Sequence, residues 1–144
     1  MTTLENALDL VRKELAKTMG INPVVRYSRL QTLGEIPAAA RYFVEPGGVE
    51  TQRRNFGAPR QIFQIRCVSE RLVPPAEVPD AARAEAEFWL LAAWKFMSEP
   101  RLGYEAFVRS AVTFSDAPSG YNVEALDSGA GAVVGGVELT VVFD

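Results

Sequence analysis

The side chains that most often carry out catalysis or bind metal ions are scarce in this chain. Among 144 residues it contains no histidine and one cysteine, Cys67. The lack of histidine excludes the Ser-His-Asp and Cys-His arrangements of nucleophilic catalysis. A single cysteine excludes an internal disulfide and a thiolate zinc cluster. Because Cys67 falls on the apolar side of an alternating strand pattern, we interpret it as a small buried hydrophobe and not as a reactive thiol.

The acidic and glycine-rich segments do not form the pattern of a known reaction either. Glu85 and Glu87 lie two residues apart in a predicted helix, so they do not share a face. The segment 129–136 has the glycine density of a dinucleotide-binding loop, but that motif requires a helix that starts within it. Here Val133 and Val134 lead into a strand. We therefore assign no catalytic, cofactor-binding or metal-binding residue, and we expect neither an enzyme nor a cofactor.

Arginine is the other residue type that could act on a partner. Arg53, Arg54 and Arg60 surround Phe56 in and beside the polar stretch 48–59. A nucleic-acid platform would need more cationic and aromatic residues, and the net charge of −3 argues against sequence-specific nucleic-acid binding. Two interpretations stay open: an arm that docks onto an acidic protein partner, or a solvated loop. The four residues are candidates for a partner interface.

A helix is predicted at the start of the chain. Apolar residues recur at three- and four-residue intervals over residues 4–19 and form one stripe. Thr2 and Glu5 match a capping box at the start of this helix, and Gly20 matches a C-terminal cap. The spacing predicts a helix packed on a sheet with one solvated face.

A second and more apolar helix is predicted over 81–98, with Asp80 as its N-terminal cap. Its half 88–97 is apolar nearly all round, apart from Lys95. One sheet covers one face of a helix, so the rest is either buried in the core or covered by a loop, the first helix or a neighbouring subunit. Trp94 lies here and is a further interface candidate. A membrane span needs about 20 apolar residues, so we expect no membrane association.

Strand patterns account for much of the remaining chain. The predicted strands cover 24–30, 38–44, 61–69, 107–114 and 137–143. Arg26 and Arg29 mark the first of these as an edge or rim strand, because charges protect edges, and both are interface candidates. The residues 45–48 predict a turn, and 48–59 is interpreted as a long loop or hairpin arm. The order of elements predicts one α+β domain over 1–144, a mainly antiparallel sheet flanked by an N-terminal helix and a second apolar helix.

Several short motifs occur in a recognisable order along the chain. They are the N-terminal helix, the Pro-led strand Ile36-Pro37-Ala38-Ala39-Ala40, a polar loop, the strand 61–69, a helix that closes with Glu99-Pro100-Arg101-Leu102-Gly103, and a Gly-rich segment before a final apolar strand. This pattern resembles the tail terminator (tail completion) proteins of long-tailed bacteriophages and phage-like particles, over most of the length. That family often has an acidic-Pro-x-Leu-Gly-Gly turn, and Tyr104 stands here where the second glycine would be.

The resemblance implies a structural role. Proteins of this family fold as a sheet flanked by helices and assemble as a hexameric ring at the head-proximal end of the tail tube. The ring ends tube polymerisation and joins the tail to the neck. The expected partners are copies of this chain, the tail tube protein and a neck or head-connector protein, and the expected location is the virion tail after synthesis in the host cytoplasm. We expect the arm 48–60 to be mobile in the free protein and ordered in the particle.

Two other functions remain open at this point. A different head–tail joining protein, such as a stopper or a neck subunit, would share the ring but contact different neighbours. A small-ligand-binding domain or a cryptic enzyme belongs to another class, and the lack of convergent polar residues at the strand ends argues against it.

Overall fold

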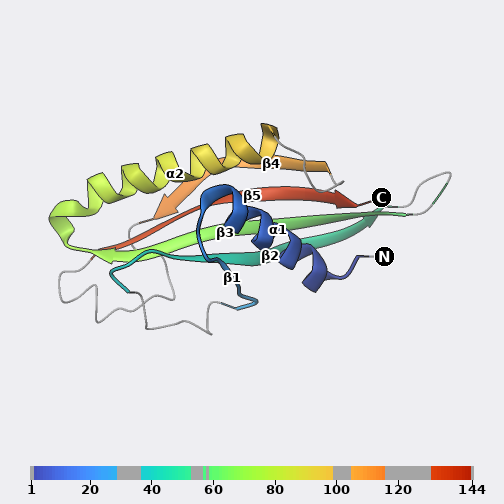
Figure 1. The fold of residues 1–144 in the computed structure, drawn as a ribbon, viewed down its shortest axis with the longest axis horizontal. Coiled ribbons are helices and arrows are strands. Elements are labelled where there is room, and N and C mark those ends of the chain that lie inside the picture. The colour runs from blue at the N-terminus through green and yellow to red at the C-terminus, as the bar shows by residue number, and fades with distance from the viewer. Residues whose placement is uncertain are drawn as a thin grey trace.

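A computed structural model describes residues 2–28, 37–52, 57, 59–98, 105–115 and 131–143. The elements, in chain order, are α1 (Leu4–Met19), β1 (Val24–Val25), β2 (Arg41–Gln52), β3 (Arg60–Val73), the 3₁₀ turn η2 (Pro75–Glu77), α2 (Val78–Ser98), β4 (Glu105–Ser115) and β5 (Gly131–Phe143). The predicted order of a helix, strands, a second helix and further strands is confirmed (Figure 1). The chain is therefore an α+β protein.

The strands form one sheet in the order β1-β2-β3-β5-β4. All neighbouring strands are antiparallel except β1 and β2, which are parallel. The predicted mainly antiparallel sheet is thus confirmed, and β1 is an edge strand as predicted. Helix α1 packs over β2 and β3, while α2 packs over β4 and β5, so the helices share one face of the sheet (Figure 1). Both chain ends lie at the end of the molecule where β2 finishes.

The hydrophobic core lies between the helices and this face of the sheet. Strand alternation directs every second side chain of β3 and β5 towards the helices. The buried residues that meet there are Ala7, Leu8, Val11, Leu15, Val44, Phe63, Ile65, Cys67, Trp89, Ala92, Ala93, Phe96, Val137, Leu139 and Val141. The predicted apolar stripe of the first helix and the predicted burial of Cys67 are confirmed. The core positions of Trp89 and Phe96 fix which side of α2 faces the sheet.

The N-terminal cap of α1 lies one residue after its predicted position, whereas the C-terminal cap is the predicted residue. The N-cap is Thr3, whose hydroxyl accepts a hydrogen bond from the N–H of Asn6 at 3.2 Å. The predicted capping box at Thr2 is therefore wrong: the backbone N–H of Thr2 donates to the side chain of Gln61 at 2.7 Å instead. Gly20 adopts the left-handed conformation, with φ of 66°, and closes the helix as predicted.

The turn predicted over 45–48 is wrong. Strand β2 starts at Arg41 and runs through to Gln52, with a β-bulge between Pro46 and Gly48. A proline is tolerated there because β2 has no strand on its outer side at this position in the described part of the chain, so its missing N–H costs no ladder bond. The bulge accommodates one extra residue between Pro46 and Gly48, so the strand continues where the sequence had predicted a reversal of the chain.

The stretch 48–59 is a hairpin, one of the two forms predicted for it. Gln52 of β2 pairs with Arg60 of β3, so residues 48–52 belong to the sheet. Residues 53–56 and 58 lie outside the described residues. The second helix begins earlier than predicted, at Val78 directly after η2, which places Asp80 in its first turn and not at its N-cap. There the carboxylate still faces the positive end of the helix dipole.

Candidate functional site

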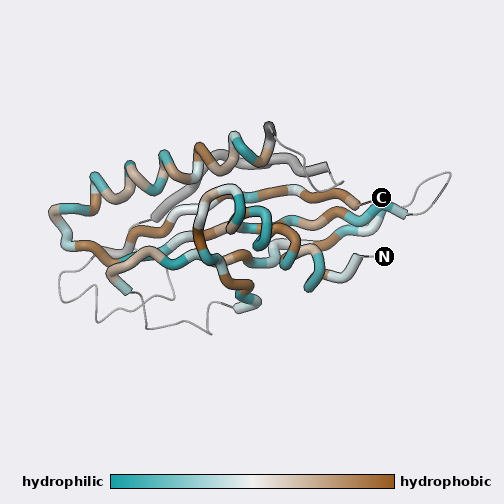
Figure 2. The backbone as a smooth tube through the Cα atoms, in the orientation of Figure 1, coloured by the Kyte–Doolittle hydropathy of each residue, from teal (hydrophilic) through white to brown (hydrophobic). Residues whose placement is uncertain are grey.

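The outer side of α2 carries the most apolar exposed surface among the described residues of the helices. Leu90 is 55% exposed, Leu91 46% and Trp94 61%, while the neighbouring Trp89 is fully buried. Positions 90, 91 and 94 follow the helical repeat and form one stripe, which we name the α2 stripe. Figure 2 shows the apolar residues of the second half of α2 beside its more polar first half. A large exposed tryptophan with two exposed leucines makes this stripe a candidate contact surface.

A buried hydrogen-bonded network fixes the rotation of α2 about its axis. The indole N–H of Trp89 donates to the hydroxyl of Ser69 at 2.8 Å, and this hydroxyl donates to the carboxylate of Glu85 at 2.6 Å. Trp89, Ser69 and Glu85 are all buried, so a polar group that lost its hydrogen-bond partner here would cost free energy of folding. Trp94 comes five residues after Trp89, which is one full helical turn plus about 140°. Because Trp89 is anchored to the sheet, Trp94 points away from it. The hydrogen bonds of Trp89 and Glu85 to Ser69 therefore determine that the α2 stripe is exposed.

A second candidate surface is the outer edge of β2 over Gly48–Gln52, which we name the β2 edge. Strand β1 pairs with β2 only at Phe43 and Val44, and every residue of the β2 edge is exposed. Strand β3 occupies its inner side through the register Gly48↔Gln64 to Gln52↔Arg60. Alternate backbone N–H and C=O groups of such an edge point outward. Among the described residues no other strand receives them.

The face of the sheet opposite the helices holds a buried ionic cluster. The guanidinium of Arg26 lies 2.9 Å from the carboxylate of Glu45 and 3.3 Å from that of Glu70. Arg41 also donates to Glu70, at 2.6 Å, and Arg26 lies over the ring of Phe43 at 3.7 Å. Two cations and two anions balance in charge here. The cluster ties the segment after β1 to β2 and β3, and we interpret it as structural.

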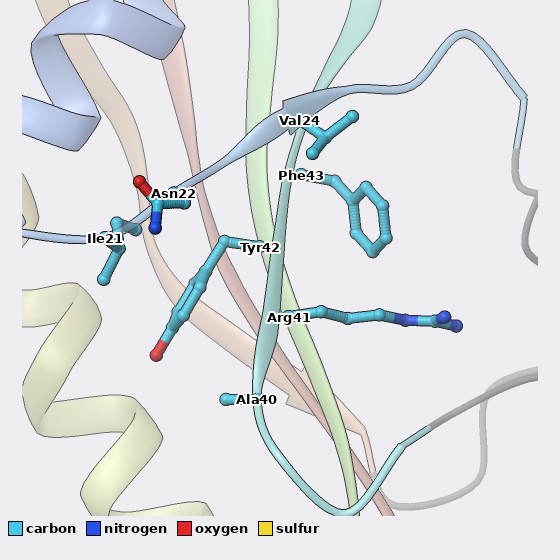
Figure 3. Close-up of a pocket in the computed structure, with 7 residues that line it drawn as sticks. All are labelled: Ile21, Asn22, Val24, Ala40, Arg41, Tyr42 and Phe43. Carbon is cyan, nitrogen blue, oxygen red and sulfur yellow. The ribbon is translucent and has the colours of Figure 1, made fainter.

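A groove lies along the edge of β2 near β1, with a volume of about 550 Å³. It is lined by Ile21, Asn22, Val24, Ala40, Arg41, Tyr42 and Phe43. Figure 3 shows Tyr42 on one side of the strand, whereas Arg41 and Phe43 extend to the other. Burial, and then the charge of Glu85, raise the pKa of Tyr42, so its hydroxyl stays protonated. The hydroxyl of Tyr42 and the guanidinium of Arg41 therefore point to opposite sides of the strand (Figure 3).

The thiol of Cys67 has the inert character that the sequence predicted. It is fully buried in the core, and burial raises the pKa of this thiol to about 12. A thiolate is the reactive form, so the native protein holds almost none at neutral pH. Within the described residues, no three acidic or cysteine side chains lie close enough together to hold a metal ion. No helix in those same residues is long and apolar enough to cross a bilayer.

The structure separates the interface candidates that the sequence placed together. Trp94 is exposed in the α2 stripe, as an interface residue must be. Arg60 is half-buried at the start of β3. Arg26 is only 2% exposed, because two carboxylates draw it inward, so it is not available on the surface as the predicted interface residue. Outside the described residues lie four more candidates: Arg29, Arg53, Arg54 and Phe56.

Two features of the candidate surfaces were not predicted. Leu90 and Leu91 complete the α2 stripe, and the helical spacing 90, 91 and 94 was the available signal for it. The open edge over Gly48–Gln52 was hidden by the Pro-Gly-Gly sequence before it, which is typical of a turn. No family model matches this chain, and no curated protein matches it either.

Proposed function

We propose that this chain is a structural subunit that assembles with copies of itself into a closed ring. In this proposal the ring is a tail terminator of a phage or phage-like particle. It sits on the head-proximal end of the tail tube, ends tube polymerisation and joins the tail to a neck or head-connector protein. The observation that carries the self-assembly is the α2 stripe, an apolar surface held outward by the buried anchor of Trp89.

The positions of the two candidate surfaces support a ring in preference to a simple pair. A closed ring uses a heterologous interface, in which two different patches of each subunit meet. The α2 stripe lies on the helix that covers β4 and β5, near one edge of the sheet. The β2 edge lies near the other edge of the sheet. Each subunit can therefore contact one neighbour with each surface, as a ring requires.

The terminator role itself is supported by the order of the sequence motifs and by the polar hairpin between β2 and β3. In the sequence, Arg53, Arg54 and Phe56 fall between Gln52 and Arg60, which pair with each other in the sheet. A cationic hairpin at the end of a ring subunit suits docking onto an acidic surface of the tail tube or neck. The ring then acts in the virion tail, with its subunits made in the host cytoplasm.

The test is the mass of the protein in solution as a function of concentration, with the same sample imaged by negative stain. The resemblance to tail terminators implies rings of about six subunits, a number that closed cyclic symmetry allows. Trp94→Ser should shift the mass towards the monomer, whereas Lys17→Ser, on the exposed side of α1, should leave the rings intact. A monomer at every concentration would contradict the self-assembly.

The position of the ring in an imaged particle tests the finer assignment. A terminator lies between the tail tube and the neck. A stopper or another connector lies closer to the head, and a ring found there would replace the terminator by that alternative.

A further inference from the structure

We propose that the β2 edge, Gly48–Gln52, accepts strand β4 of a second copy of this chain, so that the sheets of neighbouring subunits join edge to edge. This inference rests on the proposed self-assembly and adds the backbone contact through which it occurs. It differs from the apolar contact of the α2 stripe, because main-chain hydrogen bonds carry it.

The two end strands of the sheet are different elements, and every copy has both. On one side of the sheet the short β1 covers only part of β2, so β2 forms the edge over the rest of its length. On the other side β4 forms the edge (Figure 1). Among the described residues, β4 has only β5 as its partner. Exposed edges favour pairing with another chain, and a closed array removes all of them. Joining β4 of one copy to the β2 edge of the next pairs the outer sides of both strands over the five residues Gly48–Gln52.

The strand directions fit this joint. Each step from β2 to β3, from β3 to β5 and from β5 to β4 is antiparallel, so β4 runs opposite to β2 within one subunit. When the next subunit continues the sheet with the same face towards its helices, its β2 lies antiparallel to the preceding β4. Antiparallel pairs are somewhat more stable per residue than parallel pairs.

The β2 edge lacks the devices that keep other edges from pairing. The proline and the bulge of β2 lie before Gly48, and the sequence Gly48-Val49-Glu50-Thr51-Gln52 has one charge and no proline. Natural edges that must stay single are interrupted by lysine, proline or bulges within them. Five residues span about 17 Å of strand, and the β4 strand of 11 residues is long enough to cover them.

The joint also places the α2 stripe at the same boundary. Helix α2, which carries the α2 stripe, packs over β4 and β5 and so lies on the side of the subunit that contributes β4. The neighbour that contributes β2 carries α1 over β2 and β3. One interface between two copies therefore combines a backbone ladder in the sheet layer with an apolar contact in the helix layer.

Residue-resolved hydrogen exchange tests the joint on the full chain. The wild-type assembly is compared with the same protein diluted to the monomer, or with the Trp94→Ser variant. In the monomer, β3 protects only alternate amides of Gly48–Gln52. In the assembly we expect the intervening amides to slow by about tenfold or more. An assembly in which these amides exchange as in the monomer would overturn the strand joint and leave the ring itself standing.

A pair of proline variants provides a second measurement. Neighbouring N–H groups point to opposite sides of a strand, so Val49→Pro and Glu50→Pro differ in whether they remove an outward or an inward donor. We expect one of the two to keep the far-UV circular dichroism of the wild type and to raise the concentration for half-assembly by about tenfold. Assembly unchanged in both folded variants would overturn the joint. A wild type that stays monomeric at every concentration would overturn the joint and the proposed ring together.

Discussion

Arg26 and Glu70 are 44 positions apart in the sequence, and their side chains meet at 3.3 Å on the face of the sheet opposite the helices. Arg26 is 2% exposed and Glu70 is fully buried. Arg26 also reaches Glu45, so the segment after β1 is tied to both β2 and β3. A buried charge without its partner is costly, which makes this contact a sensitive point of the fold.

The first prediction concerns this cluster. Glu70→Gln should lower the free energy of unfolding by about 3–5 kcal/mol, because Arg26 and Arg41 lose a buried counter-charge. Urea denaturation followed by circular dichroism measures the change. The control is Asp80→Asn, which removes an ion pair with Arg83 in which both side chains are at least 70% exposed. This variant should cost less than about 1 kcal/mol. Equal effects of the two changes would refute the structural role of the cluster.

The two tryptophans of α2 should respond in opposite ways. Trp89→Ala should lower the free energy of unfolding by about 3–5 kcal/mol, since it empties a core position and leaves Ser69 without its donor. Trp94→Ala should change stability by less than about 0.5 kcal/mol, because its side chain is mostly in water. Only Trp94→Ala should weaken assembly without weakening the fold. Light scattering and thermal unfolding of both variants measure this difference, and a destabilised Trp94→Ala protein would contradict it.

A close backbone approach predicts the effect of a single methyl group. A Cβ atom at Gly136 would lie 2.5 Å from the carbonyl oxygen of Cys67 on β3. Gly136→Ala should therefore lower the free energy of unfolding by about 1–3 kcal/mol or more, through overpacking between β3 and β5. Gly48→Ala is the matched control, because its added methyl group meets no atom within 4 Å. Chemical denaturation measures the free energy of unfolding of both variants. Equal values for the two would contradict overpacking at Gly136.

Cys67 should make stability depend on pH in the alkaline range. The thiol has a pKa of about 12 in the folded chain, raised by burial from an ordinary value of 9.0. Below pH 9 the thiol is protonated in both states, so its contribution is fully present. Between pH 9 and about 12 only the unfolded chain ionises, and the free energy of unfolding should fall by about 1.4 kcal/mol per pH unit from this group.

The variant Cys67→Val isolates this contribution from those of lysines and tyrosines. Its stability should decline less steeply above pH 9 than that of the wild type. A thiol reagent at pH 8 should modify the wild type only after unfolding, and rapid labelling of the native protein would contradict the burial of Cys67.

The hairpin between β2 and β3 should act in docking and not in folding. Arg53→Glu combined with Arg54→Glu should leave thermal unfolding unchanged and reduce co-sedimentation with the tail tube or neck partner, because it reverses the charge of the segment. Lys13→Glu combined with Lys17→Glu is the matched control, since both lysines are exposed on α1. Unfolding of the arginine variant would instead indicate a role of these residues in the core.

Sequence periodicity by itself determined the helix bounds of α1, the existence of α2, and the inward sides of β3 and β5. These features are local, because a repeat of two or of three to four residues sets which side chains face the core. Gly20 marked its helix end for a similar reason, since few other residues adopt a positive φ of 66° without strain.

Only the tertiary structure decided which of the apolar residues of α2 are buried, because the half 88–97 is apolar on nearly every side. The contact of Trp89 with Ser69 on β3 made that choice and left Trp94 outside. The same holds for Arg26, whose carboxylate partners lie 19 and 44 residues away. The strand through Pro46 is a further case, since the open side of β2 is a property of the whole sheet. Contacts between distant segments leave no periodic signal in the sequence, so the packing of the sheet had to fix them.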